Sequence, residues 1–323
     1  MPRTKSAAGA STLSGAARGT KTGTASAFSL GTAARRTEGI GADTASKLAP
    51  GLYLVATPIG NLADVTLRAL DVLRRTDAVL CEDTRVTAKL LARHGVAAAT
   101  QPYHDHNAER VRPAILARLK AGAALALVSD AGTPLVSDPG YKLVRAALAE
   151  GIAVTVVPGA SAALTALLGS GLPPDRFLFA GFLPPKAAAR RRTLEEIKDV
   201  GATLIVYESA PRLAESLADM AEILGPRPAA VARELTKLHE EVRRADLAAL
   251  ADHYRTAGPP KGELVLVVGP PPPPAASDAE LDRALGVALA HKSLREAVEE
   301  VAVATGARRR QVYARALALK GGR

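Results

Sequence analysis

The stretch of residues 128–141 constrains the fold of this chain more than any other. It follows an apolar run, residues 123–128, that is typical of a buried strand, and it holds two prolines, two glycines and two aspartates before a helical pattern resumes. Glycine allows positive φ and close approach to a ligand, whereas proline stiffens a loop. Open α/β sheets bind ligands in such loops, at the carboxyl ends of strands. The alternative is an ordinary strand-to-helix connection. The sequences of the remaining loops are needed to choose between a ligand-binding loop and such a connection.

The strand–loop–helix pattern of this stretch recurs through residues 49–269. Short apolar runs alternate with amphipathic helical patterns, which predicts an α/β fold whose first sheet is mostly parallel. In the first such helix, residues 65–75, Leu67, Leu70 and either Val72 or Leu73 are expected to point inward. A breaker cluster at residues 169–174 predicts a boundary between two α/β domains, 49–169 and 170–269. The strands are expected near residues 52–56, 78–81, 98–101, 123–128, 153–157, 177–180, 202–207, 229–232 and 263–268.

The two ends of the chain differ from this body. Residues 1–48 are rich in Ala, Gly, Ser and Thr without a hydrophobic period, which predicts disorder. Residues 270–276 form a proline-rich linker. Residues 277–323 predict three helices, near 278–290, 294–304 and 308–319, and a turn at Gly306 joins the last two as in a helix-turn-helix. Ser-x-x-Glu capping boxes begin the first two of these helices.

Charge is concentrated at these ends. The chain has a net charge of +10, of which residues 1–48 carry +5 and residues 270–323 carry +3. Basic flanks on a nearly neutral body favour contact with a polyanion, with solubility as the alternative. The last predicted helix carries Arg308, Arg309, Arg310 and Arg315, and no acidic residue lies between Val301 and the C-terminus. We predict that this helix faces nucleic acid; a docking helix with a solvated basic face is the alternative.

Several classes of chemistry lack their motifs. The single cysteine, Cys81, excludes internal disulfides and multi-cysteine zinc sites, and it fits a cytoplasmic protein. No Gly-x-Ser-x-Gly elbow, phosphate-binding Gly-x4-Gly-Lys loop or Gly-x-Gly-x-x-Gly after a strand is present. His104 and His106 are weak evidence for a metal, and we predict none. No apolar run reaches the roughly 18 residues of a membrane-spanning helix, so no membrane contact is predicted. The remaining interpretation is a site for a small ligand, formed by the proline- and glycine-rich loops.

Seven short motifs occur together in a fixed order along the chain. They are Thr-Pro-Ile-Gly-Asn-Leu (57–62), Glu-Asp-Thr-Arg (82–85), Ser-Asp-Ala-Gly-Thr-Pro (129–134), Asp-Pro-Gly-Tyr (138–141), Gly-Phe-Leu-Pro (181–184), Tyr-Glu-Ser (207–209) and Arg-Glu-Leu-Thr-Lys (233–237). With these motifs the chain resembles the ribosomal RNA small-subunit methyltransferase I family over residues 50–269, and residues 277–320 are similar to that family's helical module. The resemblance implies two tetrapyrrole-methylase domains with a cleft between them. It also implies S-adenosylmethionine, methylation of a cytidine ribose 2′-oxygen in 16S rRNA, and a homodimer.

The resemblance also implies which residues hold the cofactor and act in catalysis. A ribose hydroxyl is a weak acid, so a base or a cation should assist its attack. The candidates are Asp83 as base, Lys237 as base or electrostatic helper, and Arg85 as a clamp on RNA phosphate. Their alternatives are a helix cap, a solvated side chain and a surface ion pair, respectively. The expected cofactor-binding residues are Pro58, Ile59, Gly60, Asp130, Ala131, Gly132, Thr133, Pro134, Val136, Ser161, Ala162, Phe182, Ala232 and Arg233.

The chain departs from the family pattern in one motif, and two other functions compete. The family's Tyr-Glu-Ser-Pro-His-Arg run reads Tyr-Glu-Ser-Ala-Pro-Arg at residues 207–212, so Pro211 replaces a histidine. Asp130 and Asp138 are interpreted as loop-shaping or cofactor-facing residues, not as a catalytic pair. A tetrapyrrole C-methyltransferase would need neither the basic flanks nor the helix-turn-helix. A non-catalytic RNA-binding assembly factor would not need the complete set of loops.

Overall fold

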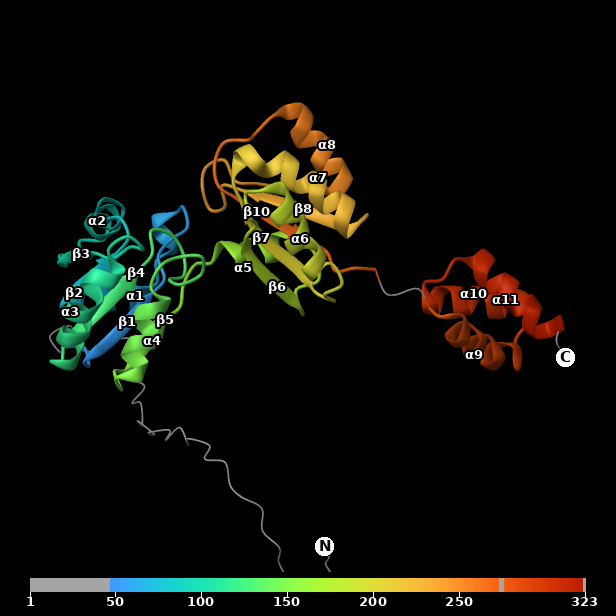
Figure 1. Ribbon diagram of the computed structural model, residues 1–323, viewed down its shortest axis with the longest axis horizontal. Coiled ribbons are helices and arrows are strands. Elements are labelled where there is room, and N and C mark those ends of the chain that lie inside the picture. Colours follow the sequence, from blue (N-terminus) through green and yellow to red (C-terminus); the bar gives the residue numbers. More distant parts are fainter. Residues whose placement is uncertain (1–46, 273–275, 322–323) are drawn as a thin grey trace, which may run out of the picture. The chain divides into compact units, whose positions relative to one another are not determined.

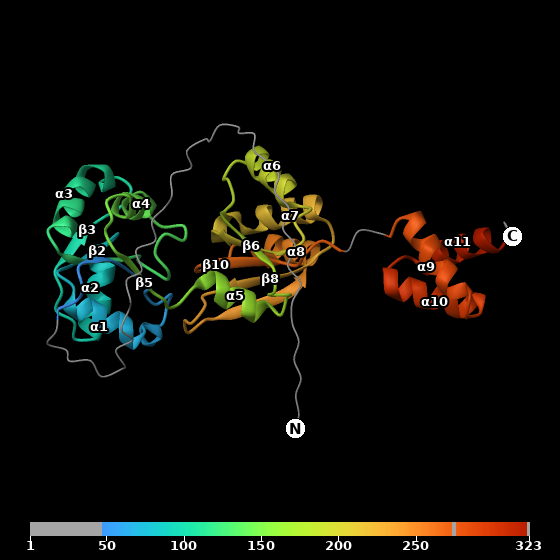
Figure 2. The ribbon, with the colours of Figure 1, turned by 90° about the horizontal axis from the view of Figure 1, so that it is seen from below.

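The computed structural model describes residues 47–272 and 276–321 (Figures 1 and 2). It contains two five-stranded sheets with their helices, followed along the chain by three further helices. The disorder predicted for residues 1–48 falls almost wholly on residues 1–46, which lie outside the described residues, as do residues 273–275 of the predicted linker. Within the described ranges, no helix is both long and apolar enough to cross a membrane.

The first sheet has the order β3-β2-β4-β1-β5, and every pair in it is parallel, which confirms the prediction. β1, β2 and β4 are buried at every residue because helices cover both faces, and such strands read as continuous apolar runs. The strands are β1 (Gly51–Val55), β2 (Ala78–Cys81), β3 (Thr100–Pro102), β4 (Ala124–Val128) and β5 (Val154–Val157), and the helices are α1 (Leu67–Arg75), α2 (Thr84–Arg93), α3 (Ala108–Lys120) and α4 (Tyr141–Ala149).

Alternation along β1 divides the core of this sheet in two. Tyr53 and Val55 pack with α1 and α2 on one face. Leu52 and Leu54 pack with α3 and α4 on the other face. This follows from the two-residue side-chain period of a strand. The prediction that Leu67 points inward is wrong: it is 74% exposed, because α1 begins after its Thr66 cap and buries Leu70, Val72 and Leu73 instead.

The second sheet has the order β6-β7-β10-β8-β9, and only β6 and β7 are parallel. Helices α6, α7 and α8 pack on one face of it, and α5 packs on the opposite face (Figure 2). The strands are β6 (Phe177–Phe182), β7 (Thr203–Glu208), β8 (Pro228–Arg233), β9 (Glu241–Asp246) and β10 (Leu264–Val268), and the helices are α5 (Ala162–Ser170), α6 (Ala187–Ile197), α7 (Leu213–Leu224) and α8 (Leu247–Ala257).

Two features of this sheet differ from the sequence-based expectation. Strand β9 was not predicted, because its sequence, Glu-Val-Arg-Arg-Ala-Asp, is mostly charged; it forms the edge of the sheet, where side chains face solvent. Helix α5 precedes the boundary predicted at residues 169–170, yet it packs on β10 and β8. Ala163, Ala166 and Leu167 of α5 are buried in this contact. The chain therefore reaches the second sheet one helix before the breaker cluster.

The C-terminal helices α9 (Asp278–Leu289), α10 (Leu294–Thr305) and α11 (Arg309–Gly321) form the helical module. Both predicted capping boxes are confirmed, since Ser277 and Ser293 each exchange hydrogen bonds with the glutamate three residues later. Gly306 ends α10 in the left-handed conformation, at φ 67°. The apolar core of the module is its own, and it includes Leu281, Leu285, Val298, Val301 and Val312.

Candidate functional site

Loops of the first sheet and segments of the second sheet line one cavity of about 510 Å³. Small-molecule sites in proteins fall in the range of ~300–1,000 Å³. The loops after β1, β4 and β5 meet here because parallel strands bring their carboxyl ends to one edge of a sheet. The lining residues are Ile59, Ala131, Gly132, Thr133, Val136, Ser137, Asp138, Ser161, Ala162, Phe182, Tyr207, Glu208, Ser209, Ala210, Pro211, Ala232, Leu235, Gly262, Glu263, Leu264 and Val265.

Reciprocal backbone hydrogen bonds join the loop after β1 to the loop after β4. Thr57 N donates to Gly132 O over 2.9 Å, and Gly132 N donates to Thr57 O over 3.1 Å. The Thr57 hydroxyl, itself buried, donates to Ser129 O, and the Thr133 hydroxyl donates to Ala160 O in the loop after β5. At position 132, φ is 81° and an added Cβ would lie 3.2 Å from Ile59 Cγ2. Glycine is therefore required at position 132, where three loops meet.

The next residues of the β4 loop hold an uncommon backbone conformation. Leu135 and Ser137 have φ values of 73° and 66°, although neither is glycine. A Cβ at Gly140, where φ is 131°, would lie 2.6 Å from Leu135 Cδ2 and 2.8 Å from Leu127 Cδ2. A left-handed backbone conformation at a residue other than glycine costs free energy. Such residues are found mainly at functional sites, where the surrounding structure enforces the conformation. Here the conformation places Ser137 and Asp138 in the cavity lining.

Asp138 is the most perturbed carboxyl group of this lining. The pKa of Asp138 is raised to about 6, mainly by burial, with the negative charges of Glu82 and Asp130 adding to the rise and the Ser129 hydroxyl offsetting part of it. Among the described residues, no cationic side chain contributes to this shift. Burial also raises the pKa of Glu82, with Asp130 and Asp105 adding to the effect. The carboxyl ends of β2 and β4 thus share uncompensated negative charge.

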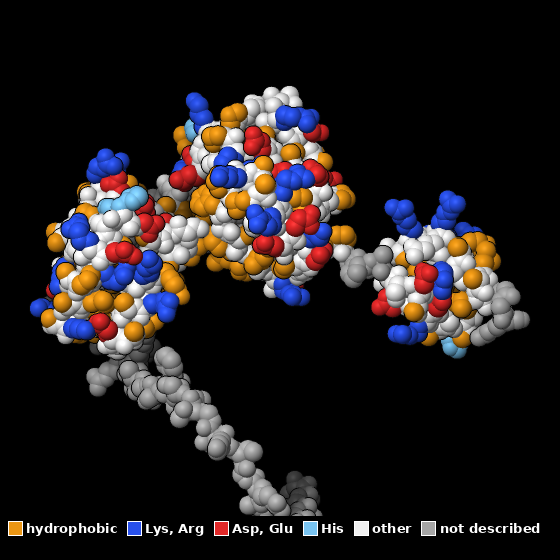
Figure 3. All heavy atoms as spheres, in the orientation of Figure 1, with side chains coloured by type: hydrophobic (Ala, Val, Ile, Leu, Met, Phe, Trp, Pro, Cys, Tyr) orange, Lys and Arg blue, Asp and Glu red, His pale blue; other side chains and the backbone are white. Residues whose placement is uncertain are grey.

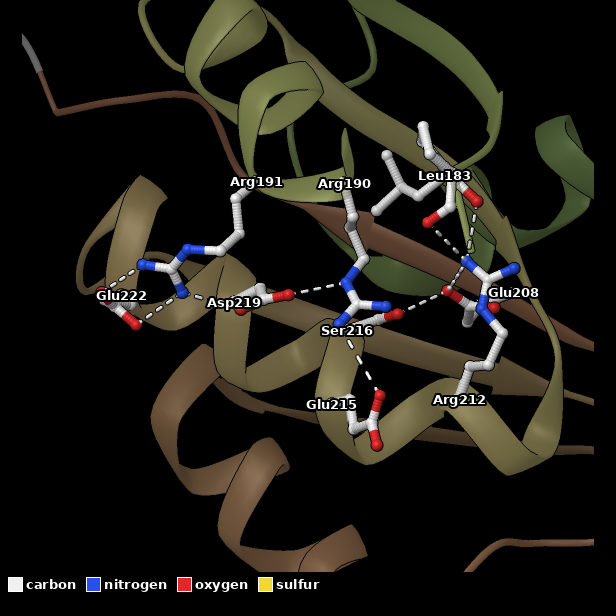
Figure 4. Close-up of polar contacts among 10 residues, drawn as sticks. Leu183, Arg190, Arg191, Glu208, Arg212, Glu215, Ser216, Asp219 and Glu222 are labelled. Atoms are coloured by element: carbon white, nitrogen blue, oxygen red, sulfur yellow. Dashed lines mark hydrogen bonds and ion pairs between the residues drawn. The ribbon is translucent and has the colours of Figure 1, made fainter. Parts of the chain in front are cut away.

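The second-sheet wall is built on a buried carboxylate (Figure 4). Glu208, at the end of β7, accepts hydrogen bonds from Ser209 N at 2.7 Å, Ser216 Oγ at 2.5 Å and Arg212 Nη2 at 3.2 Å. Arg212 Nη2 also donates to Leu183 O at 2.7 Å, just after β6. We call these four side chains, Glu208, Ser209, Arg212 and Ser216, the Glu208 clamp. It joins the ends of β6 and β7, the strands that supply Phe182 and Tyr207 to the cavity.

Further ion pairs lie beside the clamp, to its left in Figure 4. Arg190 of α6 is buried, and its Nε donates to Asp219 Oδ2 of α7 over 2.6 Å. Arg191 Nη1 bonds the other oxygen of the same carboxylate at 2.8 Å. Two of the three consecutive arginines of α6 are therefore paired with acids of α7, and these pairs join the two helices that support this wall.

Aromatic rings complete the apolar side of the second wall. The Tyr207 ring meets Phe182 edge-on, with centroids 5.5 Å apart, and meets Phe179 in the same manner at 4.9 Å. Burial raises the pKa of the Tyr207 phenol, so it stays protonated at neutral pH. Edge-to-face contacts hold the rings in fixed orientations. These rings give the wall an apolar surface that suits a planar ligand, and the Tyr207 hydroxyl adds one polar group to it.

Nine of the fourteen residues predicted to bind a cofactor line the cavity. The five others, Pro58, Gly60, Asp130, Pro134 and Arg233, are not in its lining. Asp130 Oδ1 accepts a hydrogen bond from Asp83 N at 3.0 Å, and Arg233 pairs with Glu241 at 3.2 Å. These two side chains join elements of the fold. The nine lining residues are Ile59, Ala131, Gly132, Thr133, Val136, Ser161, Ala162, Phe182 and Ala232.

Asp83 and Arg85 are bound to each other outside the cavity lining. Asp83 caps α2 by accepting from Arg85 N at 2.8 Å, and its Oδ2 lies 2.6 Å from Arg85 Nη2. The alternatives of a helix cap and a surface ion pair are therefore confirmed. The side-chain and backbone hydrogen bonds from Arg85 lower the pKa of Asp83 to about 2. A carboxyl group of that acidity is a weak proton acceptor near neutral pH.

Lys237 is held by two carboxylates. Its Nζ donates to Glu234 Oε1 at 2.7 Å and to Glu263 Oε2 at 2.9 Å. Burial lowers the pKa of Lys237, but these two hydrogen bonds outweigh that effect and the net shift is upward. The ammonium form therefore persists at neutral pH, which favours the electrostatic role over the role of base. Lys237 also approaches the β1 loop, because a Cβ at Gly60 would lie 2.5 Å from Lys237 Cγ.

Sequence reasoning missed several residues of the lining. Tyr207 stands in a motif that had been recognised, but it was not predicted to face a ligand. Asp138 was interpreted as loop-shaping or cofactor-facing, and it lies in the lining although it was not among the predicted cofactor-binding residues. Pro211, the position where the family has histidine, also lines the cavity. No sequence pattern predicted that residues 262–265 would line the cavity. They reach it because β10 pairs antiparallel with β7 and β8.

The two histidines of the β3 loop lie near each other. The rings of His104 and His106 have centroids 6.0 Å apart, and His104 Nδ1 is buried without a hydrogen-bond partner. Over residues 47–272 and 276–321, no group of three or more His, Cys, Asp or Glu side chains is arranged to hold a metal ion.

The helical module presents a groove formed by α10 and α11. Leu294 and Val298 contribute its apolar part, and Arg295, Arg309, Arg310 and Tyr313 contribute the rest. In the view of Figure 3, Lys and Arg side chains project from this module. Arg308, Arg309 and Arg310 are exposed, as expected for a nucleic-acid-facing helix.

Arg315 was expected on the same face, but it turns inward. It is half-buried, and its Nε donates to Asp282 Oδ1 at 2.9 Å while its Nη1 donates to Asp278 Oδ2 at 3.1 Å. Both acids belong to α9. Arg315 therefore fits the docking alternative. Arg308, Arg309 and Arg310 stay exposed, although Arg309 also lies 3.5 Å from Glu299 of α10.

Comparison with known proteins extends over both sheets and the helical module. A family model described as Tetrapyrrole (Corrin/Porphyrin) Methylases matches residues 51–251, and one described as RsmI C-terminal HTH domain matches residues 275–320. The crystal structure of uroporphyrin-III-C-methyltransferase from Thermus thermophilus is similar, with a TM-score of 0.51 at 25% identity. That similarity covers 68% of this chain and 94% of the other.

Two bacterial relatives match over nearly their whole length. A protein of Mesorhizobium japonicum named Ribosomal RNA small subunit methyltransferase I is 54% identical over 277 residues, covering 85% of this chain and 94% of that protein. A protein of the same name from Erythrobacter litoralis is 55% identical over 277 residues, covering 86% and 98%, respectively. At this identity, the matched segments share one fold.

Proposed function

Because the chain belongs to the ribosomal RNA small subunit methyltransferase I family, we propose that it methylates the ribose 2′-oxygen of a cytidine in 16S rRNA. The predicted family, the tetrapyrrole-methylase fold and the methyltransferase activity are confirmed, and the methyl donor is S-adenosylmethionine. The proposal of 2′-O transfer is supported by the cavity. Its lining combines an apolar surface for a ligand with the carboxylate of Asp138, to which the described residues offer no cationic partner.

The cavity lining fits this methyl donor. Ile59, Val136, Phe182 and Leu235 offer apolar contacts for the adenosine. The first turn of α5, capped by the Ser161 hydroxyl, lies in the lining and favours the carboxylate of the methionine part. Neither contact needs a charged side chain. When bound, S-adenosylmethionine supplies an electrophilic methyl group on a sulfonium.

The protein's own residues act mainly by positioning. The three joined loops hold one wall of the cavity, and the Glu208 clamp holds the other, so the acceptor oxygen can be placed in line with the methyl group. We propose that Arg85, whose side chain is 87% exposed, meets an RNA phosphate outside the cavity. Lys237 supplies positive charge near the same loops.

The experiment for the reaction is methyl transfer from tritiated S-adenosylmethionine to 30S subunits, followed by digestion to nucleosides. We expect label in 2′-O-methylcytidine. Label in a base-methylated nucleoside would contradict 2′-O transfer. Label in a tetrapyrrole acceptor with none in RNA would favour the alternative C-methyltransferase, and binding of the donor without any transfer would favour the assembly factor.

We propose that the helical module binds the rRNA through its α10–α11 groove. Exposed arginines attract phosphates, and Tyr313, which is 46% exposed, offers a ring for base stacking. Replacing Arg309 and Arg310 with alanine should weaken binding to 30S subunits about tenfold and reduce the salt slope by about 2, measured by filter binding from 50 to 200 mM salt. The exposed Arg283 of α9 provides a control for charge alone, since Arg283→Ala removes one charge from the module outside the groove, where the double variant removes two within it.

We also propose a homodimer in the cytoplasm, as expected for an enzyme acting on ribosomal RNA. Leu164 and Leu168 lie one turn apart on α5 and are 47% and 74% exposed. Exposed apolar pairs of this kind mark protein contacts. Analytical ultracentrifugation should show a dimer that Leu168→Glu converts to a monomer; a wild-type monomer at micromolar concentration would contradict the proposal.

A further inference from the structure

We propose that Asp138 is the general base that accepts the proton of the attacking ribose 2′-hydroxyl. The inference rests on the proposed function and deepens it, because it names the side chain that activates the acceptor. Asp138 was interpreted from the sequence as a loop-shaping or cofactor-facing residue, and Asp83 and Lys237 were the candidate bases. The structure reverses this assignment through the partners of each group.

The cavity lining contains three carboxyl groups, those of Asp138, Glu208 and Glu263. Glu208 is occupied by the clamp, with bonds from Arg212, Ser216 and Ser209. Glu263 accepts from Lys237 Nζ at 2.9 Å. Asp138 has no cationic partner among the described residues. A general base needs a lone pair that no internal cation holds, and of these three carboxylates only Asp138 meets that requirement.

The backbone carries Asp138 to the place where both walls meet. It follows Ser137, whose φ is 66°, and a Cβ at Gly181 of β6 would lie 3.6 Å from Ser137 Oγ. Asp138 also acts electrostatically on Tyr207 of the second wall. Strained backbone that aims one side chain into a ligand cavity is typical of catalytic segments. The acceptor oxygen must reach this same region to meet a methyl group held by the loop.

The surrounding charges suit the task of a base. Glu82 after β2 and Asp130 in the same loop face Asp138 with negative charge, the Ser129 hydroxyl contacts it, and Tyr207 faces it from β7 as a neutral phenol. These neighbours and partial burial hold the pKa of Asp138 at about 6. A base in this range is ionised at pH 7 and still binds a proton well, which is the compromise that proton transfer favours.

The proposed step balances without another reactant. The 2′-oxygen forms a bond to the methyl carbon while the bond from that carbon to the sulfonium sulfur breaks, and its electron pair stays on sulfur. The 2′-hydroxyl proton moves to a carboxylate oxygen of Asp138, and the O–H pair remains on the ribose oxygen. The products are the 2′-O-methyl ribose, a neutral thioether and a protonated Asp138 that returns its proton to water.

Asp138→Asn tests the step because it keeps the size of the side chain and removes the base. We expect the single-turnover rate on 30S subunits to fall about 100-fold, while S-adenosylhomocysteine binds within about threefold of wild type in calorimetry. The wild-type kcat/KM should rise about tenfold per pH unit below pH 6 and level off above it. This limb should be absent in Asp138→Asn and return in Asp138→Glu. Asp252→Asn, on the surface of α8, is the isosteric control.

A readout independent of activity is the carbon-13 titration of the Asp138 carboxyl in the full chain, assigned by its loss in Asp138→Asn, with an expected midpoint near pH 6. Wild-type rate and an unchanged pH limb in Asp138→Asn would overturn the inference alone. A parallel loss of S-adenosylhomocysteine affinity and rate would make Asp138 a cofactor ligand and would also overturn it. If the wild-type protein puts no label into 2′-O-methylcytidine, the proposed function fails, and the inference fails with it.

Discussion

The two walls of the cavity treat their carboxylates in opposite ways. The second-sheet wall buries Glu208 and surrounds it with an arginine, two hydroxyls and a backbone amide. The first-sheet wall leaves Asp138 half-buried among like charges, and no cation from the part of the chain that the structure describes pairs with it. A fully paired buried carboxylate fixes a conformation, whereas an unpaired one keeps the capacity to bind a proton. The comparison indicates that one wall provides rigidity and the other provides chemistry.

The largest effect should come from breaking the rigid wall. Glu208→Ala would remove the acceptor of the buried Ser216 hydroxyl and the carboxylate partner of the partly buried Arg212, and we expect it to reduce the free energy of unfolding by about 3 kcal/mol. Urea denaturation followed by circular dichroism measures the loss. Glu222→Ala, on α7, removes an exposed partner of Arg191 and should stay close to wild type. Equal losses in the two variants would remove the distinction between a clamp and a surface ion pair.

A smaller effect is expected from a strained backbone in the first-sheet wall, which holds Asp138. Gly140→Ala places a Cβ against Leu135 and Leu127 at a φ of 131°, and it should cost about 2–3 kcal/mol and lower the affinity for S-adenosylhomocysteine. Gly151→Ala provides the control, because φ there is 71° and no atom lies within 4 Å of the new Cβ. The control should cost about 1 kcal/mol and leave the affinity unchanged. Thermal unfolding and calorimetry would show whether the two glycines differ.

Asp138 should also affect stability, in the opposite sense to a paired carboxylate. Its pKa is raised from 3.8 to about 6, so the folded state binds the proton more tightly than the unfolded chain does. Its contribution is therefore most favourable below pH 4 and is lost as the pH rises toward 6. After allowance for solvent screening, Asp138→Asn should stabilise the protein by about 1 kcal/mol at pH 7. Urea midpoints at pH 4 and pH 7 test this; an equal difference at both pH values would refute it.

The smallest effect is expected at Lys237. Its ion pairs with Glu234 and Glu263 are partly exposed, so Lys237→Met should change stability by less than about 1 kcal/mol. The pH limb near 6 should remain in the kcat/KM profile of this variant, because Lys237 is not the base. Loss of that limb would indicate that Lys237, not Asp138, is the base, and the chemistry would then belong to the second-sheet wall.

The first wall was the more predictable from sequence, for a physical reason. Parallel strands buried on both faces are continuous apolar runs, and their loops carry the glycines and prolines that a ligand site needs, so β1, β2 and β4 were placed within one or two residues. The second sheet pairs distant segments antiparallel, and its polar edge, β9, has no hydrophobic pattern. Of its contribution to the cavity, the family resemblance predicted Phe182 and Ala232, and the local hydrophobic pattern predicted nothing.

The sequence alone could not choose among the candidate bases, for a related reason. Residue type marks Asp83, Asp138 and Lys237 equally, and only their partners separate them. Arg85 is two residues from Asp83 and could have been suspected from sequence, whereas Glu263 lies far along the chain from Lys237. The electrostatic surroundings of Asp138 depend on Glu82, which follows another strand. Ionisation is a property of the assembled fold, and it follows from sequence only where partners are local.

Helix α5 has a consequence for anyone who would divide this protein into two fragments. Because Ala163, Ala166 and Leu167 are buried against β8 and β10, a cut at the breaker cluster after α5 would leave the N-terminal fragment with an exposed apolar helix and the C-terminal fragment with an uncovered sheet. A cut at residues 158–160, before the Ser161 cap, keeps the helix with the sheet it covers. Split-protein reporters and circular permutants of this fold should therefore be opened there, where each half retains its own core.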